Sequence, residues 1–245
     1  MEPIFRVDGD RVVTSPDAAG PWDPRMQHGS APAALVVWAA EAIPTPVPMR
    51  IARVTIDLMR PVPVAPLTVS SEILRDGRKI QLCGVRLLAD GVLVVSATVL
   101  KIKRQAAELP SDIAAVQVEL PGPDESMVEP GNLANSPFVK CISMRAARGR
   151  FGVMGPGAIW FRVNQPLIAG AAVSQAMRAV VASDFSNGTS PALDFNRWTF
   201  INADLESVVE PGLFDVWIAP SAQGGPVATF RVVAPEGQTP VGDQR

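Results

Sequence analysis

The residues best suited to chemistry in this sequence stand at the ends of two apolar, Ala-rich segments. The first segment follows His28 and Gly29, and the second ends at Asp184. Amides at the start of a helix carry its positive dipole end, so the amides of Gly29, Ser30 and Ala31 could stabilise negative charge on a carbonyl oxygen. A carboxylate at a partly dehydrated helix end, such as Asp184, could hold a water molecule and take its proton.

Each of these residues also has an interpretation without chemistry. Gly29 could be an ordinary capped helix start, and Asp184 could be a helix-terminal aspartate whose turn is completed by the Asn-Gly pair that follows. His28 is the only histidine. It could contact a substrate or the Asp184 region, cap the helix, or pair with Asp23, and all three interpretations stay open.

Composition and charge exclude several classes of function. The chain has 245 residues, 47% of them hydrophobic, and a formal net charge of −2, so it lacks the basic excess of a nucleic-acid-binding protein. We therefore expect no nucleic-acid partner. No apolar run approaches the roughly 20 residues of a membrane span, and charges in the first ten residues argue against a signal peptide. The prediction is a cytoplasmic protein with no membrane span.

The sequence contains no motif typical of a metal site or of a serine-hydrolase site. Cys83 and Cys141 are too far apart to suggest a ligand pair, and with a single histidine we expect no metal and two buried thiols. The serines of the second apolar segment lack the Gly-x-Ser-x-Gly pattern of a nucleophile elbow. The glycine-rich stretch 152–157 lacks a following Lys-Ser/Thr pair, which favours a plain hairpin loop over a phosphate-binding loop.

The elements that must position the first group of residues are a buried helix and a sequential antiparallel sheet. Residues 29–43 repeat apolar side chains at helical spacing, and three prolines follow. Alternating apolar residues then predict strands from residue 50 onward and again from residue 67. Asp-Gly pairs at 76–77 and 90–91 stand between apolar runs, which is the strongest short-range signal for a hairpin.

The same order of elements returns after a stretch rich in proline and glycine. The second half predicts extended segments at 137–148 and 158–163, a helix at 167–183, and strands at 198–209, 215–219 and 227–233. We therefore predict an α+β protein with residues 1–105 as one module, 106–135 as a linker and 136–245 as a second module. The second module is expected to lack a full last strand.

Several short motifs in this order resemble double-hotdog acyl-CoA thioesterases of the long-chain acyl-CoA thioesterase II type. They are Trp22-Asp23-Pro24-Arg25-Met26-Gln27-His28-Gly29, Asp57-Leu58-Met59-Arg60-Pro61-Val62-Pro63, Gly77-Arg78-Lys79, Ala182-Ser183-Asp184-Phe185-Ser186-Asn187-Gly188 and Trp198-Thr199-Phe200-Ile201-Asn202-Ala203-Asp204-Leu205. The resemblance implies a tandem hotdog, in which each module is a central helix wrapped by an antiparallel sheet. It also implies that acyl-CoA lies between the modules.

The resemblance further implies a catalytic set of Asp, Thr and Gln that orients a water. The Asp corresponds to Asp184. Ile201 stands where the family has the Thr, which leaves Thr199 or Asn202 as neighbouring substitutes, and Gln244 stands near the place of the Gln. Substrate contacts are expected from three residues at the first helix start, namely His28, Gly29 and Ser30.

The expected function is hydrolysis of a fatty acyl-CoA thioester by an Asp-oriented water, without a cofactor, in lipid metabolism. One alternative is a hotdog protein that binds acyl thioesters without cleaving them. Another is an enoyl-CoA hydratase, because Asp23 and His28 have the spacing of that family's Asp-x-Asn-Pro-x-His motif, although Arg25-Met26-Gln27 departs from its core. An open sheet edge near residue 245 would be a pairing site for a second copy of the chain.

Overall fold

The computed structural model describes residues 2–105, 119–129, 136–194, 212–217 and 227–232. It divides into two compact units. Unit 1 comprises Met1–Glu108 and Pro121–Ala192, and unit 2 comprises Leu109–Leu120 and Leu193–Arg245. In unit 2 the strands β10 (Gly212–Trp217) and β11 (Val227–Val232) pair antiparallel. They fall on the strands expected at 215–219 and 227–233.

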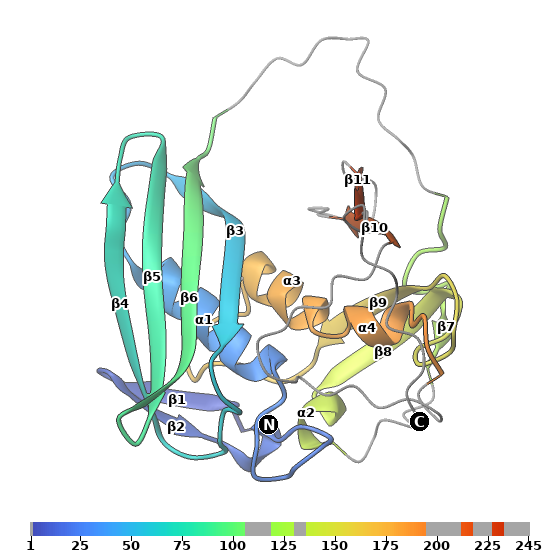
Figure 1. Ribbon diagram of the computed structural model, residues 1–245, viewed down its shortest axis with the longest axis horizontal. Helices are drawn as coiled ribbons and strands as arrows, with labels where there is room; N and C mark the ends of the chain where they lie inside the picture. Colours follow the sequence, from blue (N-terminus) through green and yellow to red (C-terminus); the bar gives the residue numbers. More distant parts are fainter. Residues whose placement is uncertain (1, 106–118, 130–135, 195–211, 218–226, 233–245) are drawn as a thin grey trace, which may run out of the picture. The chain divides into compact units, whose positions relative to one another are not determined.

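The largest element of unit 1 is a six-stranded sheet with the order β1-β2-β4-β5-β6-β3 (Figure 1). Its long strands are β3 (Met49–Leu58), β4 (Leu67–Asp76), β5 (Ile80–Ala89) and β6 (Val92–Lys103). The hairpins β4–β5 and β5–β6 turn at the two predicted Asp-Gly pairs. At the second pair, Asp90 and Gly91 both have positive φ, which a tight two-residue turn requires.

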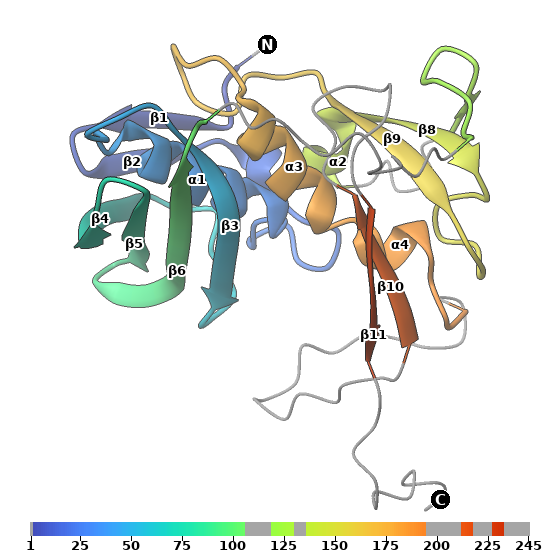
Figure 2. The same cartoon turned by 90° about the horizontal axis from the view of Figure 1, so that it is seen from above.

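Helix α1 (Ser30–Ala42) packs against one face of this sheet, as predicted from its uniformly apolar sequence. Leu35, Val36 and Val37 are completely buried, and so are Val85, Val95 and Val99 of the strands that it covers. Figure 2 shows α1 within the curve of the sheet. The helix therefore forms the centre of the hydrophobic core.

The first residues form a hairpin that the sequence analysis did not predict. Strands β1 (Phe5–Asp8) and β2 (Arg11–Thr14) pair antiparallel through a turn at Gly9, whose φ is +61°. A short 3-10 helix, η1 (Pro16–Ala18), follows. The hairpin joins the sheet through the pairing of Arg11 and Val12 with β4 and through the Val69 amide of β4, which donates to the Asp10 carbonyl at 2.8 Å.

The later part of unit 1 has its own small sheet, in the order β7-β8-β9. Its strands are β7 (Met127–Val128), β8 (Ile142–Arg148) and β9 (Ala158–Val163). β9 matches the predicted strand, whereas β7 lies inside the segment 106–135 that was expected to be a linker.

Two predictions in this region are wrong at their first residues. Residues 137–140, expected to be extended, form the helix α2 (Pro137–Lys140). Pro137 begins this helix, a position where a missing N–H costs nothing. The second apolar helix was expected from residue 167, but α3 (Gln175–Ser183) starts after Ser174, whose hydroxyl accepts a hydrogen bond from the Met177 amide.

Two residues of the segment before α3 are buried without being helical. Leu167 and Ile168 are apolar and fully enclosed, and the Leu167 carbonyl accepts from the Phe5 amide while the Ala169 amide donates to the Phe5 carbonyl. Pairing with β1 therefore replaces helical hydrogen bonds. After α3 comes the short helix α4 (Ser186–Thr189). Helices α1 and α3 lie side by side in one continuous core (Figure 2).

Candidate functional site

The carboxylate of Asp184 lies against the start of α1. Asp184 is the residue at which α3 ends, and its Oδ2 accepts hydrogen bonds from the Ser30 amide at 2.9 Å and the Ser30 hydroxyl at 3.3 Å. Helix α1 begins after Gly29 without a cap from its own segment. The Asp184 carboxylate therefore supplies the missing acceptor, and its negative charge faces the positive end of the helix dipole.

His28 also contacts this carboxylate. Its Nδ1 lies 2.9 Å from Asp184 Oδ2 and 3.3 Å from the Ser30 amide nitrogen. Nδ1 cannot both donate to the carboxylate and accept from an amide. The shorter contact and the bond that the Ser30 amide already makes to Asp184 favour Nδ1 as a donor to Oδ2. This assignment leaves the lone pair of the neutral imidazole on Nε2.

The pair is buried unequally. The side chain of His28 is 11% exposed, whereas that of Asp184 is 39% exposed. Burial alone would raise the pKa of Asp184, but the hydrogen bonds from His28 and Ser30 outweigh burial and hold this pKa below its usual value. Asp184 is therefore an anion at neutral pH that remains partly open to an incoming molecule.

Two phenylalanines enclose the imidazole. Phe138 of α2 and Phe185, the residue after Asp184, stack on His28 with ring centroids at 5.1 and 4.7 Å and interplanar angles of 20° and 24°. Phe151 and Phe161 extend the cluster through Phe185. The sequence analysis missed these aromatic residues. Phe185 stands inside one of the motifs, but Phe138 has no signal beyond being apolar.

Ser30 and Gly29 fix the approach of the two helices. Ser30 is fully buried, and its single hydroxyl hydrogen is shared between Asp184 Oδ2 at 3.3 Å and the nearer Val181 carbonyl of α3 at 2.9 Å. A Cβ added to Gly29 would lie 3.0 to 3.2 Å from the Asp184 carboxylate. The glycine is therefore required by close approach, since its φ of −57° is open to any residue.

The structure narrows the expected set of amide donors. The Ser30 amide donates to Asp184, and the Ala31 amide donates to the His28 carbonyl at 2.9 Å. Among the described residues the Gly29 amide has no hydrogen-bond partner. Of the three amides at this helix start, Gly29 is the one left for a substrate oxygen.

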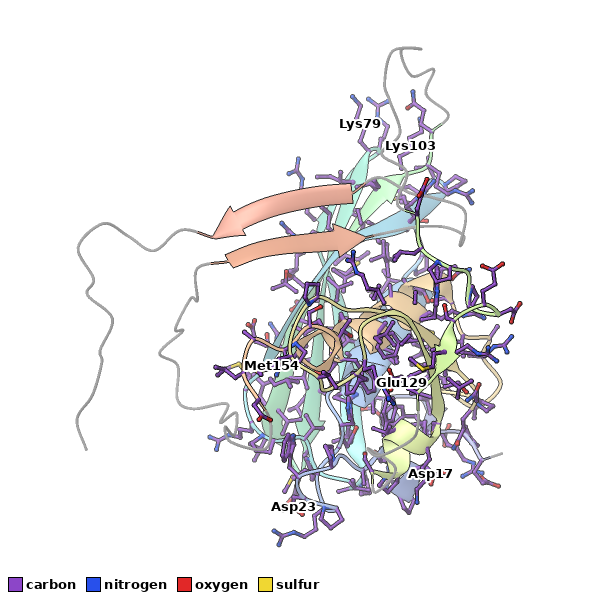
Figure 3. All side chains as sticks on the ribbon, turned by 90° about the vertical axis from the view of Figure 1, so that its right-hand side faces the viewer. Asp17, Asp23, Lys79, Lys103, Glu129 and Met154 are labelled. Atoms are coloured by element: carbon purple, nitrogen blue, oxygen red, sulfur yellow. The ribbon has the colours of Figure 1, made fainter. Side chains whose placement is uncertain are left out.

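The pairing of Asp23 with His28 is not formed. The Asp23 carboxylate contacts the Arg25 guanidinium at 2.7 Å and accepts from the Arg25 amide, and these hydrogen bonds lower the pKa of Asp23 to about 2. Asp23 lies at the periphery of unit 1 (Figure 3), while His28 turns to Asp184. The water-activating pair of the hydratase alternative is therefore absent from the described site.

The other predicted catalytic residues lie outside the described residues. They are Thr199, Asn202 and Gln244. Within the described ranges, no group of three or more His, Cys, Asp or Glu side chains could hold a metal ion. Cys83 and Cys141 are free and buried, and burial raises the pKa of the Cys141 thiol to about 11.

Comparison with known proteins bears on the fold that surrounds this site. The sequence model of the family described as acyl-CoA thioesterase N-terminal domain matches residues 18–102. That range contains α1 and the strands that surround it. No curated protein matches the chain.

Solved structures share the fold at low sequence identity. A hotdog-fold protein from Alicyclobacillus acidocaldarius is 20% identical with a TM-score of 0.58, covering 76% of this chain and 70% of its own. A proposed thioesterase from Novosphingobium aromaticivorans is 23% identical with a TM-score of 0.53, covering 76% and 75%. A proposed thioesterase II from Thermobifida fusca is 15% identical with a TM-score of 0.58, covering 88% and 84%.

These similarities confirm the expected α+β tandem hotdog fold. None of the helices in the described part is long and apolar enough to cross a membrane.

Proposed function

We propose that the chain hydrolyses the thioester of a fatty acyl-CoA, on the premise that residues 18–102 match the family described as acyl-CoA thioesterase N-terminal domain. In this proposal the Asp184 carboxylate orients the attacking water. One observation carries it: an ionised, partly exposed carboxylate lies beside a histidine at the start of the family domain's central helix.

The groups at this helix start suit the steps of thioester hydrolysis. The reaction needs a positioned water, an acceptor for its proton and a donor to the oxyanion that forms on the carbonyl. The Asp184–His28 pair supplies the first two groups. The free Gly29 amide, at the positive end of α1, supplies the third, so that substrate contacts come from His28 and Gly29 while Ser30 holds the carboxylate.

The remaining catalytic positions of this proposal follow from family resemblance alone. Thr199 or Asn202 would replace the family Thr, and Gln244 would be the family Gln. The proposal also keeps the division into modules 1–105 and 136–245, with acyl-CoA between them and no cofactor.

The proposal is tested by hydrolysis of acyl-CoAs of several chain lengths, followed with a thiol reagent. We expect Asp184→Asn to lower kcat about 100-fold or more, because a correctly placed acid or base contributes at least this factor. Asp23→Asn is the matched control: it removes an exposed carboxylate near the same helix that is bonded to Arg25, and kcat should stay within about twofold.

Undiminished hydrolysis by Asp184→Asn would refute the role of this residue. A second candidate, binding without cleavage, is favoured by the sequence because Ile201 replaces the family Thr. Saturable binding of acyl-CoA by the wild type, with no turnover at any chain length, would establish that candidate instead.

A further inference from the structure

We propose that His28, through Nε2, is the group that accepts the proton of the hydrolytic water, and that Asp184, Phe138 and Phe185 hold its ring for this role. The inference rests on the proposed hydrolysis and deepens it: Asp184 orients the attacking water through the His28 ring and not by direct contact. It assigns His28 a catalytic role in place of the substrate contact that the sequence suggested.

The first support is the orientation of the ring. The contact between Nδ1 and Asp184 Oδ2 is 2.9 Å, and the rings of Phe138 and Phe185 both stack on the imidazole. The stacked rings limit tilting of the imidazole plane, and the hydrogen bond limits rotation about the bond to Cβ. Nε2 therefore points away from the carboxylate in one defined direction.

The second support is that Nε2 is unengaged. With the proton on Nδ1, Nε2 carries the free lone pair. No residue in the described ranges forms a hydrogen bond with Nε2. The buried side-chain N and O atoms without a hydrogen-bond partner in those ranges are Thr14 Oγ1 and Gln27 Oε1. Nε2 of His28 is therefore not a buried atom without a partner.

The third support is the weakness of Asp184 as a base. Its Oδ2 receives hydrogen bonds from Ser30 and from His28, and these bonds stabilise the anion and lower its pKa despite burial. A carboxylate so stabilised has little tendency to take a proton from water. The same negative charge favours the positive imidazolium that forms when Nε2 is protonated, which is the role of the aspartate in a catalytic triad.

The proposed step balances without another reactant. The water oxygen bonds to the thioester carbon while one water proton moves to Nε2, and the carbonyl oxygen becomes an oxyanion facing the Gly29 amide. The oxyanion then collapses, the carbon–sulfur bond breaks, and the leaving thiolate takes the proton from Nε2. The products are a carboxylic acid and free coenzyme A.

The decisive variant is His28→Asn. An asparagine amide can occupy the place of Nδ1 and donate to Asp184, so the cap of α1 is kept, but it has no atom equivalent to Nε2. We expect kcat to fall about 100-fold or more with KM nearly unchanged. His28→Ala should regain part of its kcat when free imidazole is added, in proportion to the imidazole concentration.

Phe138 and Phe185, which stack on His28 and together form an aromatic clamp, give a second test. Phe138→Leu and Phe185→Leu should lower kcat about tenfold, since the ring gains freedom to tilt. Phe161→Leu is the matched control, because Phe161 contacts Phe185 at 5.2 Å and makes no ring contact with His28. Thermal unfolding of each variant separates lost positioning from lost folding.

The outcomes separate this inference from the proposed function. If Asp184→Asn loses activity while His28→Asn keeps the wild-type kcat or changes only KM, the hydrolase stands and the inference falls. If His28→Asn and Asp184→Asn together cost about as much as either alone, the two residues act as one unit, as proposed. A wild type without hydrolysis refutes both.

Discussion

A charged side chain from another element satisfies the backbone at each end of helix α1, but the two charged groups differ in their exposure to solvent. The helix has no acidic residue in its first turn and no basic residue in its last. At its start the Asp184 carboxylate accepts from Ser30, and at its end the Lys101 ammonium donates to the Ile43 carbonyl at 2.8 Å. Each charge has the sign that the helix dipole favours at that end.

The difference lies in exposure and in origin. Lys101 is 4% exposed and comes from β6 of the surrounding sheet, where Gln81 of β5 also caps the Pro44 carbonyl. The Asp184 side chain is 39% exposed and contacts His28. It stands at the end of α3, which lies beside α1 but is far from it in sequence. We infer that the end of α1 is held for stability, whereas its start is held for chemistry.

The largest effect that would sharpen this comparison is expected from Lys101→Met. The substitution leaves the partly buried Ile43 carbonyl without its donor, which should lower the free energy of unfolding by about 1–3 kcal/mol. The kcat of the folded protein should not change. Chemical denaturation and an acyl-CoA hydrolysis assay measure the two quantities.

The control for this variant is Lys103→Met, which removes an exposed lysine two residues along the same strand, at the outer end of the sheet (Figure 3). Its unfolding free energy should stay within about 0.5 kcal/mol of the wild type. The comparison breaks down if Lys101→Met abolishes hydrolysis while stability is unaffected.

Gly29→Ala tests the start of the helix with an effect of intermediate size. The new Cβ would press on both carboxylate oxygens of Asp184, which must move by a few tenths of an ångström. We expect kcat to drop about tenfold because catalysis depends on the placement of this group. The unfolding free energy should change by about 1 kcal/mol or less.

Gly122→Ala is a suitable reference for this variant, since a Cβ at residue 122 would meet nothing within 4 Å. Steady-state kinetics of the two alanine variants side by side give the result. If Gly29→Ala lowers the folding equilibrium constant about tenfold and leaves kcat unchanged, the start of α1 is a purely structural contact.

The smallest effect is expected in the pH dependence of stability. The pKa of Asp184 is lower in the folded protein than the usual 3.8, because hydrogen bonds from His28 and Ser30 outweigh burial. Such a group stabilises the fold above the unfolded pKa, and the contribution disappears as the pH falls through the folded value. The stability advantage of the wild type over Asp184→Asn should therefore shrink below about pH 4.

Urea unfolding of both proteins at a series of pH values measures this difference. An advantage that stays constant into the acid range would mean that the carboxylate gains nothing from its partners. Other carboxyl groups titrate in both proteins, so they cancel in the comparison.

Local patterns in the sequence predicted the first half of the fold well. Helix α1 and the two Asp-Gly hairpins depend on residues close together in the chain, and they were found within one or two residues. The start of α3 was misplaced because Leu167 and Ile168 have helical apolar spacing but pair with Phe5, far away in sequence. Helix α2 was missed although Ser136-Pro137 is a helix-start signal.

The candidate site was predicted only in part for the same reason. Residue types and family resemblance led to Asp184 and His28 separately, yet their contact spans more than 150 positions, and no local pattern encodes such a contact. The aromatic clamp combines Phe138 from the misassigned helix α2 with Phe185. The resemblance predicted the candidate residues, and packing decides which of them touch.

The distance in sequence between Ser30 and its cap has a consequence for the order in which the protein is made. Synthesis proceeds from the N-terminus, so α1 and its sheet emerge while Asp184 has not yet been translated. During that interval the start of α1 lacks the Asp184 carboxylate that accepts from its Ser30 amide, although Lys101 for its other end is already present. The acceptor at the start of α1 therefore becomes available only after α3 has been synthesised.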